Sequence, residues 1–131
     1  MNAGGNGKPW DLAERSFAFS IAIVKLCQRL DRIPGVPRRL SGQLFDAGTS
    51  VGSNVGEGQA AQSRHDFISK FAIALKEANE SDYWLSLLVG AELLAAVEVK
   101  ALLAEARELA KILGRSIVTA RRNDPKPKRV R

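Results

Sequence analysis

The sequence predicts an all-α fold, an antiparallel up-down-up-down four-helix bundle, from three observations. Apolar residues recur at spacings of three and four along most of the chain, which is typical of helices buried on one face. Alanine and leucine are plentiful and aromatic residues make up only 6% of the chain, a composition that favours helices. Prolines and a capping signal then divide the chain into four segments joined by short loops.

The length of the chain, 131 residues, suits one domain. It suffices for a single hydrophobic core and is too short for two. We predict a disordered segment over 1–9, a bundle over 10–122 and a disordered basic tail over 123–131. The first segment is rich in glycine and asparagine and shows no periodicity, and Pro125 and Pro127 forbid a helix in the last one.

The first helix, expected from about Trp10 to Asp31, has two apolar stripes. One stripe contains Ala13, Phe17, Ile21 and Val24, and the other contains Phe19, Ile23, Leu26 and Leu30. A small domain rarely buries both sides of such a helix alone. We therefore expect the first helix to contact both its own bundle and a neighbouring chain. A proline-rich turn over 33–37 ends it.

The central helix, expected over about 38–59, combines an apolar stripe with many glycines. Its apolar residues are Leu40, Leu44, Ala47, Val51 and Val55. Each glycine inside a helix costs roughly 1 kcal/mol relative to alanine, so the glycines need a compensating role. Gly48, Gly52 and Gly56 lie four residues apart, which favours a smooth ridge that another helix approaches closely. A phosphate-binding loop is disfavoured because Glu57 stands near the position where that motif needs lysine.

The third helix begins at a capping signal, Ser63 followed three residues later by Asp66, in which each side chain bonds back to the backbone. Its apolar pattern continues to about Leu94, and we place a weak break at Ala95-Ala96. The fourth helix follows and ends near Arg122. Its apolar positions are Val99, Leu102, Ala106, Leu109, Leu113, Ile117 and Ala120, at spacings of three and four.

Positive charge is concentrated at the C-terminus. The net charge is +6, and residues 121–131 hold six basic residues and one acidic residue, a net of +5. A second basic cluster flanks the turn after the first helix. Together they are the candidate nucleic-acid-binding residues: Arg29, Arg32, Arg38, Arg39, Arg121, Arg122, Lys126, Lys128, Arg129 and Arg131. The alternative is that the corner carries solvated helix-end charges and the tail only aids solubility.

Polar residues on the second and third helices form a further candidate feature. The predicted structural polar seam comprises Ser50, Asn54, Glu57, Glu80, Asp82 and Tyr83. Such a seam would fix the register of the two helices. The alternative is an active site or ligand site, in which Glu57 and Glu80 act as an acid–base pair.

Residue types needed for metal or disulfide chemistry are scarce. Cys27 is the only cysteine and His65 the only histidine, so neither a disulfide framework nor a Glu-x-x-His di-metal site can be built. A thiol in an apolar helix is expected to be inert. We expect no enzyme, no cofactor and no metal. Neither a signal peptide nor a membrane span is recognisable, which favours a cytoplasmic protein without membrane contact.

Two long segments carry a family resemblance. They are GTSVGSNVGEG over 48–58 and ALKEANESDYWL over 74–85, supported by Gln43-Leu44 and by Ser63 with Asp66-Phe67-Ile68. The chain from Asp11 to Arg122 resembles the bacterial four-helix bundle proteins first described as products of intervening sequences inside 23S ribosomal RNA genes. The resemblance implies a ring-like homopentamer. It also implies kinship with the accessory protein of diversity-generating retroelements, a basic pentamer suited to binding RNA and a reverse transcriptase.

These observations favour a non-enzymatic oligomeric scaffold that contacts RNA or DNA through its basic surface and tail. The alternative is a protein-binding adaptor ring without nucleic-acid contact.

Overall fold

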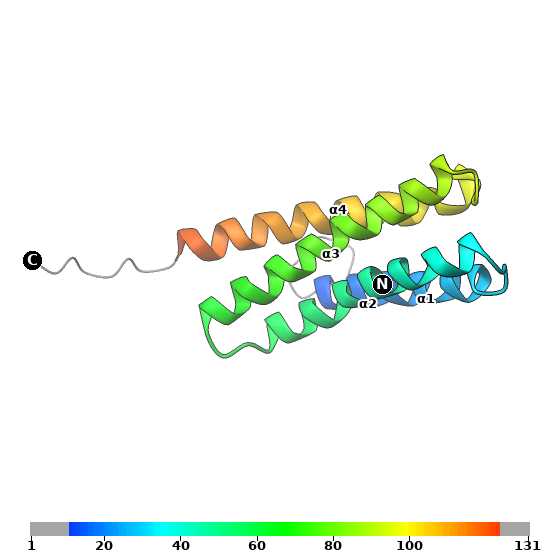
Figure 1. Ribbon diagram of the computed structural model, residues 1–131. Coiled ribbons are helices and arrows are strands. Elements are labelled where there is room, and N and C mark those ends of the chain that lie inside the picture. The colour runs from blue at the N-terminus through cyan, green and yellow to red at the C-terminus, as the bar shows by residue number, and fades with distance from the viewer. Residues whose placement is uncertain (1–10, 124–131) are drawn as a thin grey trace, which may run out of the picture.

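The computed structural model describes residues 11–123, which form four helices and no strand. The helices are α1 (Asp11–Leu30), α2 (Val36–Gln59), α3 (Arg64–Gly90) and α4 (Ala96–Arg122). Each helix runs antiparallel to the next, so the α1–α2 and α3–α4 turns lie at one end, the turn end (Figure 1). The α2–α3 turn and the end of α4 lie at the other, the tail end. The predicted up-down-up-down bundle is confirmed. The predicted disordered segments lie outside the described residues, apart from Asn123 at the end of α4.

The helices pack in chain order. α2 contacts α1 and α3 extensively, α3 contacts α4 extensively, and α1 contacts α4 only sparsely. Within residues 11–123 the diagonal pairs α1–α3 and α2–α4 make no backbone contacts. α1 has 20 residues where α3 and α4 have 27 each, so α4 extends beyond the start of α1 at the tail end (Figure 1). The bundle is therefore most open between α1 and α4.

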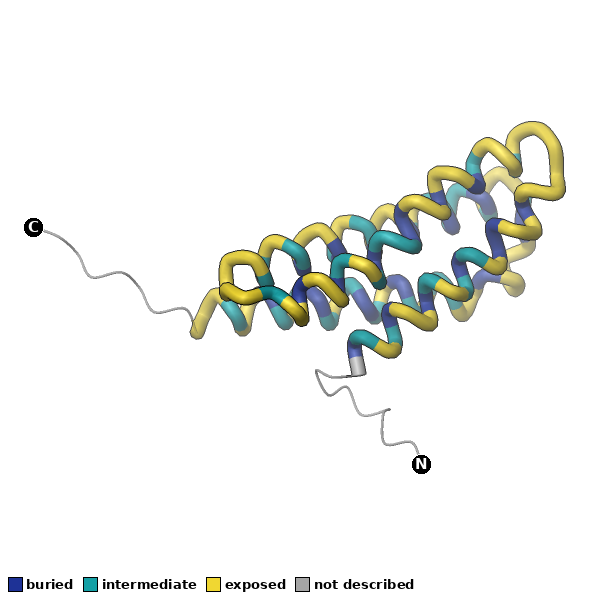
Figure 2. The backbone as a smooth tube through the Cα atoms, turned by 90° about the horizontal axis from the view of Figure 1, so that it is seen from below, coloured by how far each residue is buried: buried dark blue, intermediate teal, exposed yellow. Residues whose placement is uncertain are grey.

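Buried residues line the inner faces of all four helices (Figure 2). The largest fully buried ones are Phe71, Ile23, Leu30, Leu44, Leu85, Leu88, Leu109 and Leu113. Burying one such side chain contributes about 1.5–3 kcal/mol, so this core supplies most of the driving force for folding. The apolar stripe predicted for α2 is the buried stripe, except that Leu40 is half-buried.

The glycines of α2 let α1 approach closely at two positions. A Cβ atom at Gly48 would lie 2.6 Å from the Ile23 side chain, and one at Gly52 would lie 2.7 Å from Ser20 Oγ. Ser20 also donates a hydrogen bond of 2.9 Å to the Gly48 carbonyl. The predicted close contact is confirmed at Gly48 and Gly52.

Gly56, the third residue of the predicted ridge, faces open space, so the prediction is wrong there. The next glycine along α2 serves a different neighbour. A Cβ atom at Gly58 would lie 2.6 Å from the Phe71 ring of α3. The smooth surface therefore turns from α1 to α3 as α2 approaches its end.

Two helix starts follow local signals. Ser63 caps α3, and its Oγ accepts a hydrogen bond of 3.0 Å from the Asp66 N–H, as predicted, whereas the predicted return bond from the Asp66 side chain is not among the bonds of the described residues. α2 begins at Val36, two residues before the predicted start, because Pro37 is accommodated in the first turn, where no N–H donor is needed.

The end of α3 differs from the prediction, because the helix stops at Gly90 instead of continuing to Leu94. Glu92 adopts a left-handed φ of 62°, and the Leu93 N–H donates to the Leu88 carbonyl at 2.9 Å. This is a Schellman-type helix end, which glycine usually provides. Glutamate at the left-handed position gives no sequence signal, so the apolar pattern predicts an end for α3 that is too late.

Candidate nucleic-acid interface

All four arginines predicted at the corner after α1 are exposed, but two of them bond to other groups of the chain. Arg29 forms an ion pair with Glu98 in the first turn of α4. Arg38 Nε donates to the Asp31 carbonyl at 2.9 Å. Arg32 and Arg39 are exposed and have no ion pair within the described part of the chain. Arg32 and Arg39 are therefore the corner residues best placed for an outside anion.

Glu98 links α1 to the start of α4. Its carboxylate also accepts a hydrogen bond of 3.1 Å from the Ala95 N–H. Hydrogen bonds from Arg29 first, and then from Ala95, hold the pKa of Glu98 below its ordinary value. Arg29 thus supports the bundle itself.

The basic residues of the C-terminus begin at the opposite end of the molecule. Arg121 and Arg122 are exposed in the last turn of α4, whereas the predicted residues Lys126, Lys128, Arg129 and Arg131 lie outside the described residues. α4 alone spans roughly 40 Å at 1.5 Å per residue. One chain therefore does not bring the corner arginines together with Arg121 and Arg122 (Figure 1).

The members of the predicted polar seam on α2 bond mainly within their own helix. Ser50 donates to the Asp46 carbonyl at 2.7 Å, and Asn54 donates to the Ser50 carbonyl at 2.9 Å. Glu57 reaches α3, where it forms an ion pair of 2.8 Å with Lys70. Glu57 is the α2 member with a recorded side-chain bond to α3.

The members of the seam on α3 face other partners. Asp82 accepts hydrogen bonds of 2.8 and 3.1 Å from Arg107 of α4, which lower the pKa of Asp82. Tyr83 is 58% exposed and contacts Trp84 edge-on, and Glu80 is exposed. The six residues are thus distributed over several contacts instead of being joined in one network.

The geometry also separates the two carboxylates considered as an acid–base pair. Glu57 lies beside Lys70, and Glu80 lies ten residues further along α3, about 15 Å at 1.5 Å per residue. A general acid and base must both reach one substrate within hydrogen-bond distance. Glu57 and Glu80 do not share a site in this chain.

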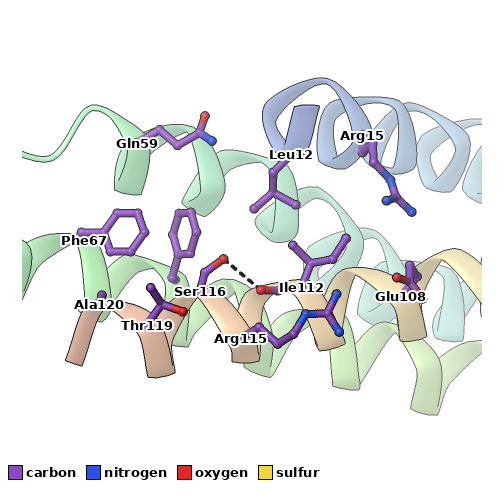
Figure 3. A pocket seen from close by; sticks show the side chains of 11 residues that line it. Leu12, Arg15, Gln59, Phe67, Glu108, Ile112, Arg115, Ser116, Thr119 and Ala120 are labelled. Atoms are coloured by element: carbon purple, nitrogen blue, oxygen red, sulfur yellow. Dashed lines mark hydrogen bonds between the residues drawn. The ribbon is translucent and has the colours of Figure 1, made fainter. Parts of the chain in front are cut away.

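A groove of about 560 Å³ opens at the tail end, where α1 stops short of α4 (Figure 3). Leu12, Phe67 and Ile112 contribute apolar surface, and Glu108 is the carboxylate among its lining residues. The Ser116 hydroxyl donates to the Ile112 carbonyl at 2.9 Å and is not held by a base. The lining therefore offers neither a paired acid and base nor an activated nucleophile.

The apolar stripe of α1 that contains Phe17, Ile21 and Val24 lies on the surface of the bundle. Phe17 is 66% exposed and Ile21 is 41% exposed. With Val24 they line a shallow apolar groove, whose α2 side is formed by Thr49 and Gly52. We call Phe17, Ile21 and Val24 the α1 outer face. It is the surface expected to contact a neighbouring chain.

Comparison with protein-family models matches residues 8–115 to the 23S rRNA-intervening sequence protein family. The chain belongs to this family. A crystal structure of a protein of unknown function from the S23 ribosomal protein family of Bacteroides thetaiotaomicron is similar, with 37% sequence identity and a TM-score of 0.77. The match covers 84% of this chain and 97% of that chain. Comparison with curated proteins finds no match. The predicted family is confirmed.

The lone cysteine and histidine of this 23S rRNA-intervening sequence family member lie in different environments. Cys27 is buried, which raises the pKa of its thiol and keeps the unreactive form. His65 is exposed in the first turn of α3. Over residues 11–123, no group of three or more histidine, cysteine or acidic side chains could hold a metal ion. None of the four described helices combines the length and apolar character of a membrane span.

A basic feature on the outer surface of α4 was not predicted from the sequence, although Arg122 at its end was among the candidate residues. Five exposed cations recur there at spacings of seven, four, four and seven, and we call them the α4 stripe: Lys100, Arg107, Lys111, Arg115 and Arg122. The same helical period that located the apolar faces would have located this stripe, had it been applied to charged residues.

Proposed function

We propose that this protein is a non-enzymatic, self-associating scaffold that contacts RNA or DNA through its basic surface. One observation carries the proposal. Exposed arginines without ion-pair partners in the described chain lie at both ends of the bundle, Arg32 and Arg39 at the turn end and Arg121 and Arg122 at the tail end. Arginines of this kind bind nucleic-acid phosphates and release counterions.

Self-association is supported by the α1 outer face. Phe17 and Ile21 expose apolar surface on one side of α1, and a contact between copies would remove that surface from water. The family resemblance favours a homopentamer. A ring would bring several copies of each basic end onto one particle, and linked weak sites bind a long nucleic acid more tightly than one site does.

The test measures binding of the full-length chain to labelled RNA and DNA over a range of salt concentrations. We expect affinity to fall as salt rises. A variant lacking residues 121–131 and carrying Arg32→Gln and Arg39→Gln should bind more weakly, with a shallower salt dependence. Equal affinity and equal salt slope for this variant and the wild type would contradict the proposal.

A second candidate function, a protein-binding adaptor, is favoured by exposed apolar side chains on α3. Ile73 and Tyr83 are both exposed there. A reverse transcriptase is a candidate partner because the family resemblance includes retroelement accessory proteins. If a defined partner stays bound after nuclease treatment and Tyr83→Ser releases it, the adaptor function gains support. The lone buried thiol supports a cytoplasmic location for either function.

A further inference from the structure

α4 separates its charges onto different sides. Two of its acidic side chains face α1, where Glu98 pairs with Arg29 and Glu105 pairs with Arg15. The cations of the α4 stripe are exposed. Within the described chain, Arg107 is the member of the stripe with an ion pair, to Asp82, and its side chain remains 58% exposed. Positive charge on this surface is therefore largely uncompensated.

The α4 stripe is long and straight, and Glu108, a half-buried residue of the tail-end groove, is the acidic residue of α4 at its edge. At 100° per residue its five members stay within about a quarter of a turn, and from Lys100 to Arg122 they span roughly 33 Å. Ala104, Gly114 and Val118 share the same side of α4, so the surface between the cations is small and uncharged. The stripe runs toward the C-terminal residues 121–131, which add further basic residues in the sequence.

The side chains of the stripe suit one class of ligand. α4 contains no aromatic residue on which an unpaired base could stack, and the stripe contains no asparagine or glutamine to read base edges. The exposed large apolar side chains of α4, Val97 and Val118, lie 21 residues apart, so α4 has no continuous apolar face to insert into a lipid surface. What remains is a row of charges at regular intervals, which complements a polyphosphate backbone.

We propose that the α4 stripe binds the phosphate backbone of a nucleic-acid duplex without regard to sequence, an inference that rests on the proposed function. α4 lies diagonally across the bundle from α2, with which it makes no backbone contact in the described structure. The α1 outer face and the α4 stripe lie on different helices, so contact at the α1 outer face does not itself cover the stripe.

The test compares lysines in matched settings. Lys111 on α4 and Lys76 on α3 are both exposed and both lie within long helices. Binding of the full-length chain to labelled 30-base-pair RNA and DNA duplexes of two unrelated sequences is measured against salt. Log affinity falls as log salt rises, and we expect Lys111→Gln to reduce the magnitude of this slope by about 0.9. Lys111→Gln with Arg115→Gln should reduce it by about 1.8. Lys76→Gln should leave the slope unchanged, and Lys111→Arg should keep the wild-type slope.

The outcomes separate the two proposals. If the wild type binds no nucleic acid, the proposed function fails and the inference fails with it. If the wild type binds duplexes but Lys111→Gln with Arg115→Gln behaves like Lys76→Gln, the inference alone is overturned. Tenfold tighter binding to a 30-nucleotide single strand overturns it as well. An equal loss of affinity of the double variant for anionic vesicles or for polyglutamate also overturns the inference. Circular dichroism and sedimentation check that each variant keeps its fold and assembly.

Discussion

At the scale of single residues, Gly48 and Gly56 occupy one helix but have opposite surroundings. A Cβ atom added at Gly48 would overlap the Cβ and Cγ atoms of Ile23. A Cβ atom added at Gly56 would meet nothing within 4 Å. We expect Gly48→Ala to lower the free energy of unfolding by about 1–3 kcal/mol, because overpacking outweighs the gain in helix propensity. Gly56→Ala should raise it by up to about 1 kcal/mol, because only the propensity gain remains.

Urea denaturation of the two variants measures both effects in the same protein. The comparison is internally controlled, since both changes add one methyl group to α2. A shift of both variants in the same direction would show that close contact with α1 is not the reason for glycine at position 48.

At the scale of helices, two ion pairs join α1 to α4 along their sparse contact. Arg15 binds Glu105 through two hydrogen bonds, of 3.0 Å from Nε and 2.8 Å from Nη2, and both side chains are about two-thirds buried. Paired hydrogen bonds of this kind hold both side chains in a fixed geometry. A double-mutant cycle with Arg15→Ala and Glu105→Ala should give a coupling free energy of about 0.5–1 kcal/mol.

The ion pair between Glu57 and Lys70 is the control for this cycle, because both of its side chains are more exposed. Its coupling should be smaller, since water screens an exposed pair. A larger coupling free energy for Glu57 and Lys70 than for Arg15 and Glu105 would refute the view that the partly buried pair between α1 and α4 is the stronger one.

Two glutamates should respond to pH with opposite signs. Hydrogen bonds from Arg29 and Ala95 lower the pKa of Glu98 in the folded state. The contribution of Glu98 to stability is therefore complete above the pKa that Glu98 has in the unfolded chain. That contribution is lost as pH falls through the lower pKa of the folded state. Burial first, and then Glu80, raise the pKa of Glu77, so Glu77 favours folding more when it is protonated.

Thermal melts between neutral and acidic pH check these signs. Glu98→Gln should lower stability at neutral pH and reduce the loss on acidification. Glu77→Gln should raise stability at neutral pH, and its advantage should shrink as acid protonates Glu77 in the wild type. Parallel pH profiles for the two variants would contradict the assignment.

The helices could be predicted because each has a clear apolar period. The side-chain contacts between the helices could not be predicted. Periodicity places Ser50, Asn54 and Glu80 on helix faces without giving the distances between helices, so it predicts one polar seam where the structure has several separate contacts. The early end of α3 escaped prediction because Glu92, not glycine, takes the left-handed position. The close contacts of Gly48 and Gly52 were predictable from their spacing, whereas the open space at Gly56 was not, because spacing along one helix does not give the distance to the next.

At the scale of the whole molecule, the α1 outer face makes assembly testable. Replacing Phe17 and Ile21 with serine removes most of its exposed apolar surface, so we expect the oligomer to dissociate into folded monomers. Val97→Ser with Val118→Ser, two exposed valines on α4, is the control and should leave the oligomer intact. Sedimentation velocity distinguishes these outcomes, and a stable wild-type monomer would overturn the proposed assembly.

The packing of the helices in chain order has a consequence for how the particle is made. Contacts between consecutive helices have short sequence separation, and the one pairing of distant segments among the four described helices, α1 with α4, is sparse. Helical bundles with such local contacts fold within microseconds to milliseconds. Subunit association takes milliseconds to minutes and depends on concentration. If the chain assembles as proposed, the cellular concentration of folded monomer, and not folding itself, sets how quickly complete particles appear.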